Sequence, residues 1–239
     1  MTRVVISQPM YFPWAGFLAQ MSLADVYIWL DDVLFSKGSF TNRIQVKLPS
    51  GCKWMSVPLI KKGSRRSIQD LEATDVDWKR GHRTLLGQSL CDRRFFDEAM
   101  FLFDEAIASE GTLCDCLIAS AEVQARYLGV LPPNILRASS LGITGRSWQR
   151  VMDIIDAVGG SSYITGHGAT HYFDHCAFEA REIDVRYMSY NLLPWPQSNG
   201  DFTPYVSGLD FIASVQPEDA LNHLRPESAN WRDFFASKE

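Results

Sequence analysis

The sequence contains no apolar run of the roughly eighteen residues that a membrane-spanning helix needs. Near its start, only the apolar residues Val4, Val5 and Ile6 precede Gln8 and Pro9, and this run is far shorter than the apolar core of a signal peptide. Basic residues are not in surplus either, because the 239 residues carry a net charge of −5. A general nucleic-acid binder is normally basic, so we expect a cytoplasmic protein with no membrane span and no nucleic-acid partner of that kind.

Cysteine is scarce and irregularly spaced. The five cysteines are an odd number, so we expect reduced thiols rather than a disulfide framework. Cys114 and Cys116 form a CxC pair that would suit a redox or metal site. Their apolar, helix-like surroundings favour buried thiols instead.

Several motifs that carry known chemistry are absent from the sequence: GxSxG, Walker A, and a GxGxxG segment that follows a strand. His167, His171 and His175 recur every four residues and would share one face of a continuous helix, an arrangement that suits a metal site. Gly166 and Gly168, however, place His167 in a loop before that helix begins. We therefore predict no metal site, and no motif identifies a cofactor.

Strands and helices alternate at the start of the sequence. Residues 4–6 predict a strand, followed by an aromatic loop, a helix-like segment and a second strand that ends on Asp31 and Asp32. This order predicts a βαβ unit, and a second alternation of strand, helix and strand follows late in the sequence. We therefore predict an α/β fold with a mixed, mainly parallel sheet. The second alternation covers residues 163–166, 171–180 and 183–188.

Two further elements are inserted into this pattern. The turn signal Pro49-Ser50-Gly51 separates residues 44–47 from residues 54–59, which predicts an antiparallel hairpin. In residues 78–128 the apolar side chains recur at steps of three and four, which predicts a segment of two or three amphipathic helices.

We expect one compact domain with three parts. Residues 1–75 form an N-terminal βαβ and hairpin part, residues 76–130 the helical segment, and residues 131–239 a second α/β part with a loop-rich tail. Thr144 or Ser147 is the expected cap of a helix in the third part. The further elements predicted there are a strand over 134–137, that helix over 147–158, and short helices near 208–214 and 218–223.

The loop that follows the first strand, residues 8–14, lies where a parallel sheet usually binds its ligand. Its two prolines fix the backbone, Gln8 offers an amide that can recognise a base or a carbonyl, and Tyr11 and Trp14 offer flat faces for stacking. The alternative is a tight turn whose rings only pack on the sheet. We predict that Gln8, Tyr11 and Trp14 bind the substrate.

A charged loop follows the second strand. Asp32 ends that strand and suits a general base, while Lys37, Asn42 and Arg43 suit the binding of a phosphate or carboxylate group. The alternative is a turn with a solvated ion pair, which contributes little. We predict that Lys37, Asn42 and Arg43 contact the substrate and that Asp32 is catalytic.

His82 is the second predicted catalytic residue, because imidazole titrates near neutral pH and can act as an acid or a base. A lone histidine is more often structural, and that alternative stays open. A basic loop before it suits a diphosphate clamp, although a solvated loop is the commoner outcome. The loop contains Lys61, Lys62, Arg65 and Arg66.

With these residues in view, the sequence resembles the WbqC-like family, a bacterial group associated with gene clusters for O-antigen and other surface polysaccharides. The most specific match is the segment ISQPMYFPWAGF at residues 6–17. The late segments match in outline only, and the histidines of residues 166–174 depart from the family pattern. The further matching segments are residues 24–26, 31–35, 42–43, 54–58, 78–82, 163–166 and 172–173.

The resemblance implies an enzyme that acts on a nucleotide-linked sugar. We expect a transferase of surface-polysaccharide biosynthesis that moves an acyl or aminoacyl group from a donor to the amine of a nucleotide-linked amino sugar. A carrier tRNA that delivers the aminoacyl group is the one nucleic acid compatible with this interpretation.

Two alternatives stay open. The proline-containing loop after the first strand is similar in placement to that of the nucleotidylyltransferases, which implies nucleotidylyl or adenylyl transfer. Their two-histidine signature is missing, since Pro13 to Phe17 stand roughly where it would fall. The other alternative is a non-catalytic protein that binds a sugar precursor.

Overall fold

The computed structural model describes residues 1–60, 66–74 and 76–237, and its centre is a six-stranded sheet with strand order β5-β2-β1-β6-β7-β8. Neighbouring strands are parallel except for the antiparallel pair β7 and β8. The predicted α/β fold with a mixed, mainly parallel sheet is therefore confirmed. The strands are β1 (Arg3–Ser7), β2 (Val26–Trp29), β5 (Asn134–Arg137), β6 (Ser162–Thr165), β7 (Asp184–Ser189) and β8 (Glu227–Asn230).

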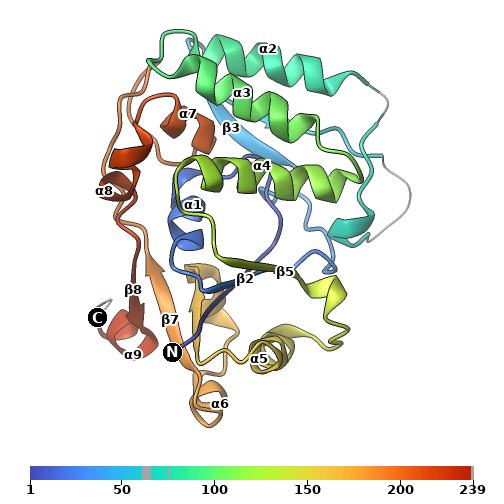
Figure 1. Cartoon of the computed structure of the whole chain (residues 1–239), viewed down its shortest axis with the longest axis vertical. Helices are drawn as coiled ribbons and strands as arrows, with labels where there is room; N and C mark the ends of the chain where they lie inside the picture. Colours follow the sequence, from blue (N-terminus) through green and yellow to red (C-terminus); the bar gives the residue numbers. More distant parts are fainter. Residues whose placement is uncertain (61–65, 75, 238–239) are drawn as a thin grey trace.

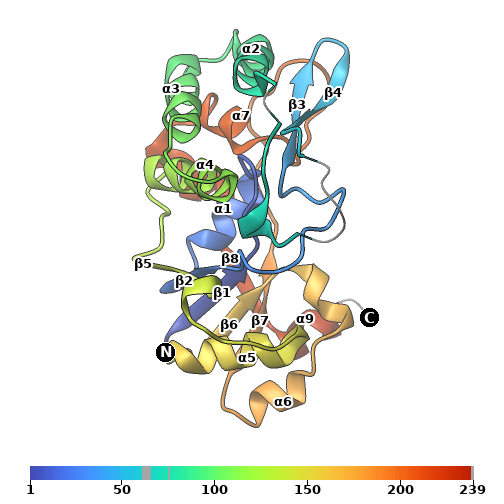
Figure 2. The ribbon, with the colours of Figure 1, turned by 90° about the vertical axis from the view of Figure 1, so that its right-hand side faces the viewer.

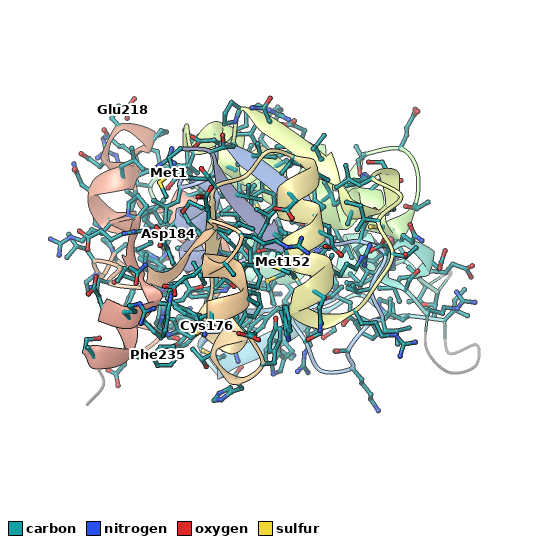
Figure 3. The ribbon with its side chains drawn as sticks, turned by 90° about the horizontal axis from the view of Figure 1, so that it is seen from below. Met1, Met152, Cys176, Asp184, Glu218 and Phe235 are labelled. Atoms are coloured by element: carbon teal, nitrogen blue, oxygen red, sulfur yellow. The ribbon has the colours of Figure 1, made fainter. Side chains whose placement is uncertain are left out.

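Helices cover both faces of the sheet (Figures 1 and 2). One face carries α5 (Ser147–Ala157), α6 (His175–Glu179) and α9 (Trp231–Ala236), which lie next to one another when the molecule is seen from that side (Figure 3). The opposite face carries a thicker layer. Its helices are α1 (Ala15–Met21), α2 (Trp78–Leu90), α3 (Phe96–Ile107), α4 (Leu113–Tyr127), α7 (Gly208–Ile212) and α8 (Ala220–Leu224).

The strands divide their side chains between two hydrophobic cores, because successive residues of a strand point to opposite faces. Val5 and Tyr27 lie in the core under α1 and α4, whereas Val4, Ile6 and Ile28 lie in the core under α5. Parallel strands that are covered on both faces read as continuous apolar runs. This burial on both faces explains why the apolar run of residues 4–6 predicts the first strand.

The inserted helical segment consists of α2, α3 and α4, as its apolar spacing predicted. A capping box starts α4: the Thr112 side chain accepts from the Asp115 N–H, and the Asp115 carboxylate accepts from the Thr112 N–H. Cys114 and Cys116 are buried on this helix, which confirms the expectation of buried thiols.

The predicted hairpin is confirmed as the separate two-stranded sheet of β3 (Arg43–Leu48) and β4 (Gly51–Ser56). Leu48 pairs with Gly51, so only Pro49 and Ser50 form the loop. Gly51 has a φ of 103°, a conformation that glycine adopts without strain. The second strand therefore starts and ends earlier than predicted.

Three details differ from the sequence predictions. Residues 167–171 form a 3-10 helix and α6 starts only at His175, because the Asp174 carboxylate accepts a hydrogen bond from the Ala177 N–H and caps the helix there. Arg146, rather than Thr144 or Ser147, occupies the cap position of α5. Strand β8 and helix α9 were not predicted.

None of the helices in the described part of the chain is long and apolar enough to cross a membrane.

A close backbone contact joins Gly208, at the start of α7, to Pro13 in the loop after β1. The Gly208 N–H donates to the Pro13 carbonyl oxygen over 2.9 Å, and a Cβ on Gly208 would lie 2.7 Å from that same oxygen. Gly208→Ala should therefore lower the free energy of unfolding by about 1–3 kcal/mol in urea titrations.

Gly81→Ala is the matched control, because Gly81 lies in α2 and a Cβ there meets no atom within 4 Å. This change should raise the free energy of unfolding by about 0.5–1 kcal/mol through helix propensity. Equal effects of the two substitutions would contradict the described contact between Gly208 and Pro13.

Candidate functional site

The topology of the sheet marks one place for a ligand. From β1 the chain crosses to β2 on one side, and β1 pairs with β6 on its other side. In open α/β sheets, ligands bind beyond the carboxyl ends of the strands where the strand order reverses in this way. The expected site therefore lies next to Ser7 and Thr165, the last residues of β1 and β6.

A pocket of about 340 Å³ lies at this position and includes both Ser7 and Thr165 in its lining. We call it the switch-point pocket. Its walls come from segments that follow four strands and from the sides of α1 and α5. The segments after the strands contribute Gln8 and Trp14 after β1, Leu30 after β2, Gly166 and Tyr172 after β6, and Tyr190 after β7.

Trp14 forms an aromatic wall of the pocket. A Cβ on Gly16 would lie 2.2 Å from the indole, so the ring folds back over this glycine. The centroid of the Tyr190 ring is 5.1 Å from that of Trp14, and the ring of Tyr205, which is 54% exposed, is 5.6 Å away on the solvent side. Two aromatic side chains of the pocket lining, Trp14 and Tyr190, therefore pack together, and the exposed Tyr205 packs against Trp14 from outside the lining.

The loop of residues 8–14 is held by backbone hydrogen bonds. The Phe12 N–H donates to the Ser120 hydroxyl over 2.8 Å, and the Tyr11 N–H donates to the Phe40 carbonyl over 3.3 Å. Phe12 has a φ of 41°, a conformation that costs energy for a bulky side chain and persists only where the surroundings fix it. The loop is therefore organised before any ligand binds.

Polar groups of the pocket are amides and hydroxyls. Gln8 and Gln20 both line it, and the Gln20 amide donates to the Ile164 carbonyl over 3.4 Å. No residue of the lining in the described ranges is Asp, Glu, Lys or Arg. Burial raises the pKa of Tyr190 to about 12 and also raises that of Tyr172, so both hydroxyls stay protonated at neutral pH. The pocket is uncharged and offers hydrogen-bond donors beside aromatic faces.

Tyr11 and His82 lie away from this pocket, in the core between α2 and the hairpin. Tyr11 is fully buried, and its hydroxyl lies 2.9 Å from the Nδ1 atom of His82. The Nε2 atom of His82 lies 3.1 Å from the Ser56 carbonyl, which can only accept, so Nε2 carries the proton and Nδ1 accepts from Tyr11. Both ring nitrogens are used, so the geometry leaves His82 no free lone pair for the predicted role as a general base.

Asp32 follows Leu30 by two residues but is not in the described lining of the pocket. Arg150 donates to both of its carboxylate oxygens, over 2.9 and 2.5 Å, and its Nε also donates to the Ile143 carbonyl. Arg150 is 9% exposed, so this ion pair is largely removed from water. The pair joins the loop after β2 to α5, and one acceptor site on each oxygen of Asp32 is used in it.

The predicted phosphate-binding residues lie at the base of the hairpin and are not in the pocket lining. Lys37 is exposed, and the Asn42 amide donates to the Val57 carbonyl over 2.9 Å. The Arg43 guanidinium donates to the Gly38 carbonyl and stacks 4.1 Å from the ring centroid of Trp54. The aromatic loop and the charged loop therefore do not line the same pocket.

The basic loop lies mostly outside the described residues, which include only Arg66 of the four basic residues predicted there. The Arg66 guanidinium is 3.3 Å from the Glu72 carboxylate. Lys61, Lys62 and Arg65 are not described.

The spaced histidines do not form one stripe. His167 Nε2 donates to the Met188 carbonyl over 2.8 Å, whereas His175 Nε2 lies 2.8 Å from the Tyr187 hydroxyl. Within the ranges that the structure describes, no group of three His, Cys, Asp or Glu side chains is placed to hold a metal ion.

Sequence reasoning missed the wall of the pocket that follows β6 and β7. Tyr163, Tyr172 and Tyr190 line it, together with Gly166, whose Cβ would lie 2.9 Å from the Tyr190 hydroxyl. The strand that runs into Gly166 carried the same signal as the first strand. The position of β6 beside β1 depends on the order of the strands in the sheet, which no pattern in the sequence indicates.

The fold and the pocket define the class of this protein: an α/β protein with a ligand pocket at the switch point of a mainly parallel sheet. The chain belongs to the WbqC-like protein family, whose model matches residues 8–221. It is also similar to the uncharacterized protein Rv1507c of Mycobacterium tuberculosis, with 28% identity over 242 residues that cover 94% of this chain and 98% of the relative. No solved structure matches the chain significantly.

The buried His82 predicts a pH dependence of stability. Burial lowers the pKa of His82 to about 4 from the ordinary value of 6.5. Below pH 6.5 the unfolded chain binds a proton that the folded chain does not bind, so stability is lost as the pH falls from 6.5 towards 4. Between pH 7 and pH 4.5, this group should remove about 2 kcal/mol from the free energy of unfolding.

The measurement is urea unfolding of wild type and His82→Gln at both pH values. The substitution should remove this share of the pH dependence, while His171→Gln, at an exposed position, should keep it. Parallel losses in wild type and His82→Gln would contradict the described burial.

Proposed function

We propose that the protein is a transferase of surface-polysaccharide biosynthesis that acylates the amine of a nucleotide-linked amino sugar. The observation that carries this proposal is the uncharged switch-point pocket, with the Trp14 face on one wall and the Gln8 and Gln20 amides in its lining. Aromatic faces beside amide and hydroxyl groups suit a sugar ring, which presents apolar C–H faces and polar edges. The resemblance to a family associated with polysaccharide gene clusters supports the same substrate class.

The pocket suits the sugar rather than the diphosphate of this substrate. Arg and Lys side chains are strong charge-assisted partners of a diphosphate, and the described lining contains neither. The sugar therefore enters the pocket, and the nucleotide extends past Trp14 towards the exposed ring of Tyr205. Tyr205 offers a second flat face beside Trp14, on which a nucleobase stacks.

The reaction is an acyl transfer. The lone pair of the sugar amine attacks the carbonyl carbon of the donor, an N–C bond forms, and the bond between that carbon and the donor's sulfur or oxygen breaks. A base takes one proton from the amine, and the leaving thiol or alcohol receives one. Because nucleotide-linked sugars are made in the cytoplasm, the proposal places the enzyme there.

Nucleotidylyl transfer has less support. That reaction requires a triphosphate and the cations that neutralise it in the site. The uncharged lining of the switch-point pocket does not provide them.

Titration calorimetry with UDP- and dTDP-linked amino sugars tests the binding step. Trp14→Ala should weaken the binding of whichever sugar binds wild type by at least about tenfold, because a stacking face is lost. Gly16→Ala should weaken it as well, since the added Cβ would lie 2.2 Å from the indole and displace it.

Trp54→Ala is the matched control, because it removes an indole from the hairpin, outside the pocket. It should leave the affinity unchanged. Equal losses in Trp14→Ala and Trp54→Ala would contradict the proposed position of the sugar.

Mass spectrometry tests the reaction itself. Wild type should add the mass of one acyl group to a bound amino sugar when it is offered acyl thioesters or aminoacyl-tRNA. No mass change with any donor, for a sugar that binds at the pocket, would reject acyl transfer.

A further inference from the structure

A second cavity, of about 390 Å³, adjoins the switch-point pocket at Tyr190. We call it the β7 cavity, because residues at and after the end of β7 line it. Tyr190 lines both cavities, so the two spaces share this side chain as a wall. His167 lines the β7 cavity, while its neighbours Gly166 and Gly168 line the switch-point pocket.

The β7 cavity contains no charged side chain among its described lining residues. Ser189 and Asn191 supply polar groups, and Met188 and Ala229 supply apolar ones. None of the described lining residues is Arg, Lys, Asp or Glu, so among them a carboxylate or phosphate finds no permanently cationic partner and an ammonium group finds no carboxylate. The cavity therefore suits a short uncharged group that contains a carbonyl.

His167 has the hydrogen bonding of a general base. Its Nε2–H donates to the Met188 carbonyl over 2.8 Å, which fixes the tautomer and leaves the lone pair on Nδ1. No described residue donates a hydrogen bond to that Nδ1. The ring is held at a centroid distance of 5.2 Å from Tyr190, edge to face. His167 is exposed, unlike His82.

We propose that the β7 cavity holds the uncharged acyl group of a thioester or ester donor, and that His167, which lines this cavity and packs against the shared Tyr190, accepts the proton from the sugar amine. This inference rests on the proposed function, since it needs the amino sugar in the switch-point pocket. It names the donor class and the base that the function requires.

The step balances without any further reactant. The amine attacks the donor carbonyl, the N–C bond forms, and the C–S or C–O bond of the donor breaks. Nδ1 of His167 takes the amine proton and then returns it to the leaving thiolate or alkoxide. Because the described lining of the cavity contains no carboxylate for an ammonium group, a simple acyl group is transferred in preference to an aminoacyl group.

The cavity is tested first without any activity measurement. The probe is S-acetyl-N-acetylcysteamine, an acetyl thioester, titrated into wild type with the backbone amide signals of Ser189 and Asn191 followed by NMR. We expect both signals to shift and saturate. Glycinamide, whose amine is charged at neutral pH, should cause smaller shifts at equal concentration.

Ala229→Leu fills the β7 cavity from β8 and should abolish the shifts. If that variant does not fold, Asn191→Leu, at an exposed lining position, serves the same purpose, with the Ser189 signal as readout. Absence of shifts in wild type, or shifts that persist in the filled variant, would overturn the assignment of the cavity.

The base is tested by His167→Gln, with His171→Gln as the control from the same 3-10 helix. His167→Gln should lower the transfer rate by at least about 100-fold, while the affinity for the nucleotide-linked sugar stays within about twofold. His171→Gln should behave as wild type. A His167→Gln enzyme that keeps its rate would overturn the role of His167.

The proposed function and the assignment of the β7 cavity are tested by different outcomes. If wild type transfers no acyl group to any amino sugar, acyl transfer fails and the role of His167 as its base fails with it. The thioester titration still decides whether the β7 cavity takes an acyl group. If wild type is active but the titration shows no binding in that cavity, the proposed function stands and the donor assignment is rejected.

Discussion

The attachment of the loop after β1 is the constraint on which the rest of the site depends. Ser120 of α4 fixes the Phe12 N–H, and Gly208 at the start of α7 fixes the Pro13 carbonyl. The loop is therefore held between two helices that come from distant parts of the sequence. Gly16 then leaves room for the Trp14 indole to fold back and form the pocket wall. Because this surface is already ordered in the folded protein, ligand binding does not require the loop to lose further conformational entropy, and this favours binding.

Asp32, Arg43 and His82 lie outside the lining of the switch-point pocket. Arg150 engages both oxygens of Asp32, Arg43 stacks on Trp54, and His82 uses both ring nitrogens within the core. These groups join elements of the fold to one another. Uncharged tyrosines and amides are left around the pocket, which is why we place the sugar there and assign proton transfer to His167, which lines the neighbouring β7 cavity.

The sequence predicted the elements better than their arrangement. The apolar runs of β1 and β6 and the helical period of α2 to α4 reflect burial, which leaves a direct pattern. Strand β8 reads Glu-Ser-Ala-Asn, residue types that are not enriched in strands, and α9 has only six residues, too few for a period. In the candidate site, the loop pattern located Gln8 and Trp14. Two other features leave no pattern in the sequence. The positive φ of Phe12 accompanies the inward position of Tyr11, and the strand order brings Tyr190 to the pocket.

The central claim is that the sugar of a nucleotide-linked amino sugar binds in the switch-point pocket. A crystal structure of the protein with such a compound tests this most directly. The account predicts the sugar ring against the Trp14 indole, with its amine directed towards Tyr190 and His167. A sugar bound at the base of the hairpin, beside Lys37 and Arg43, would contradict it.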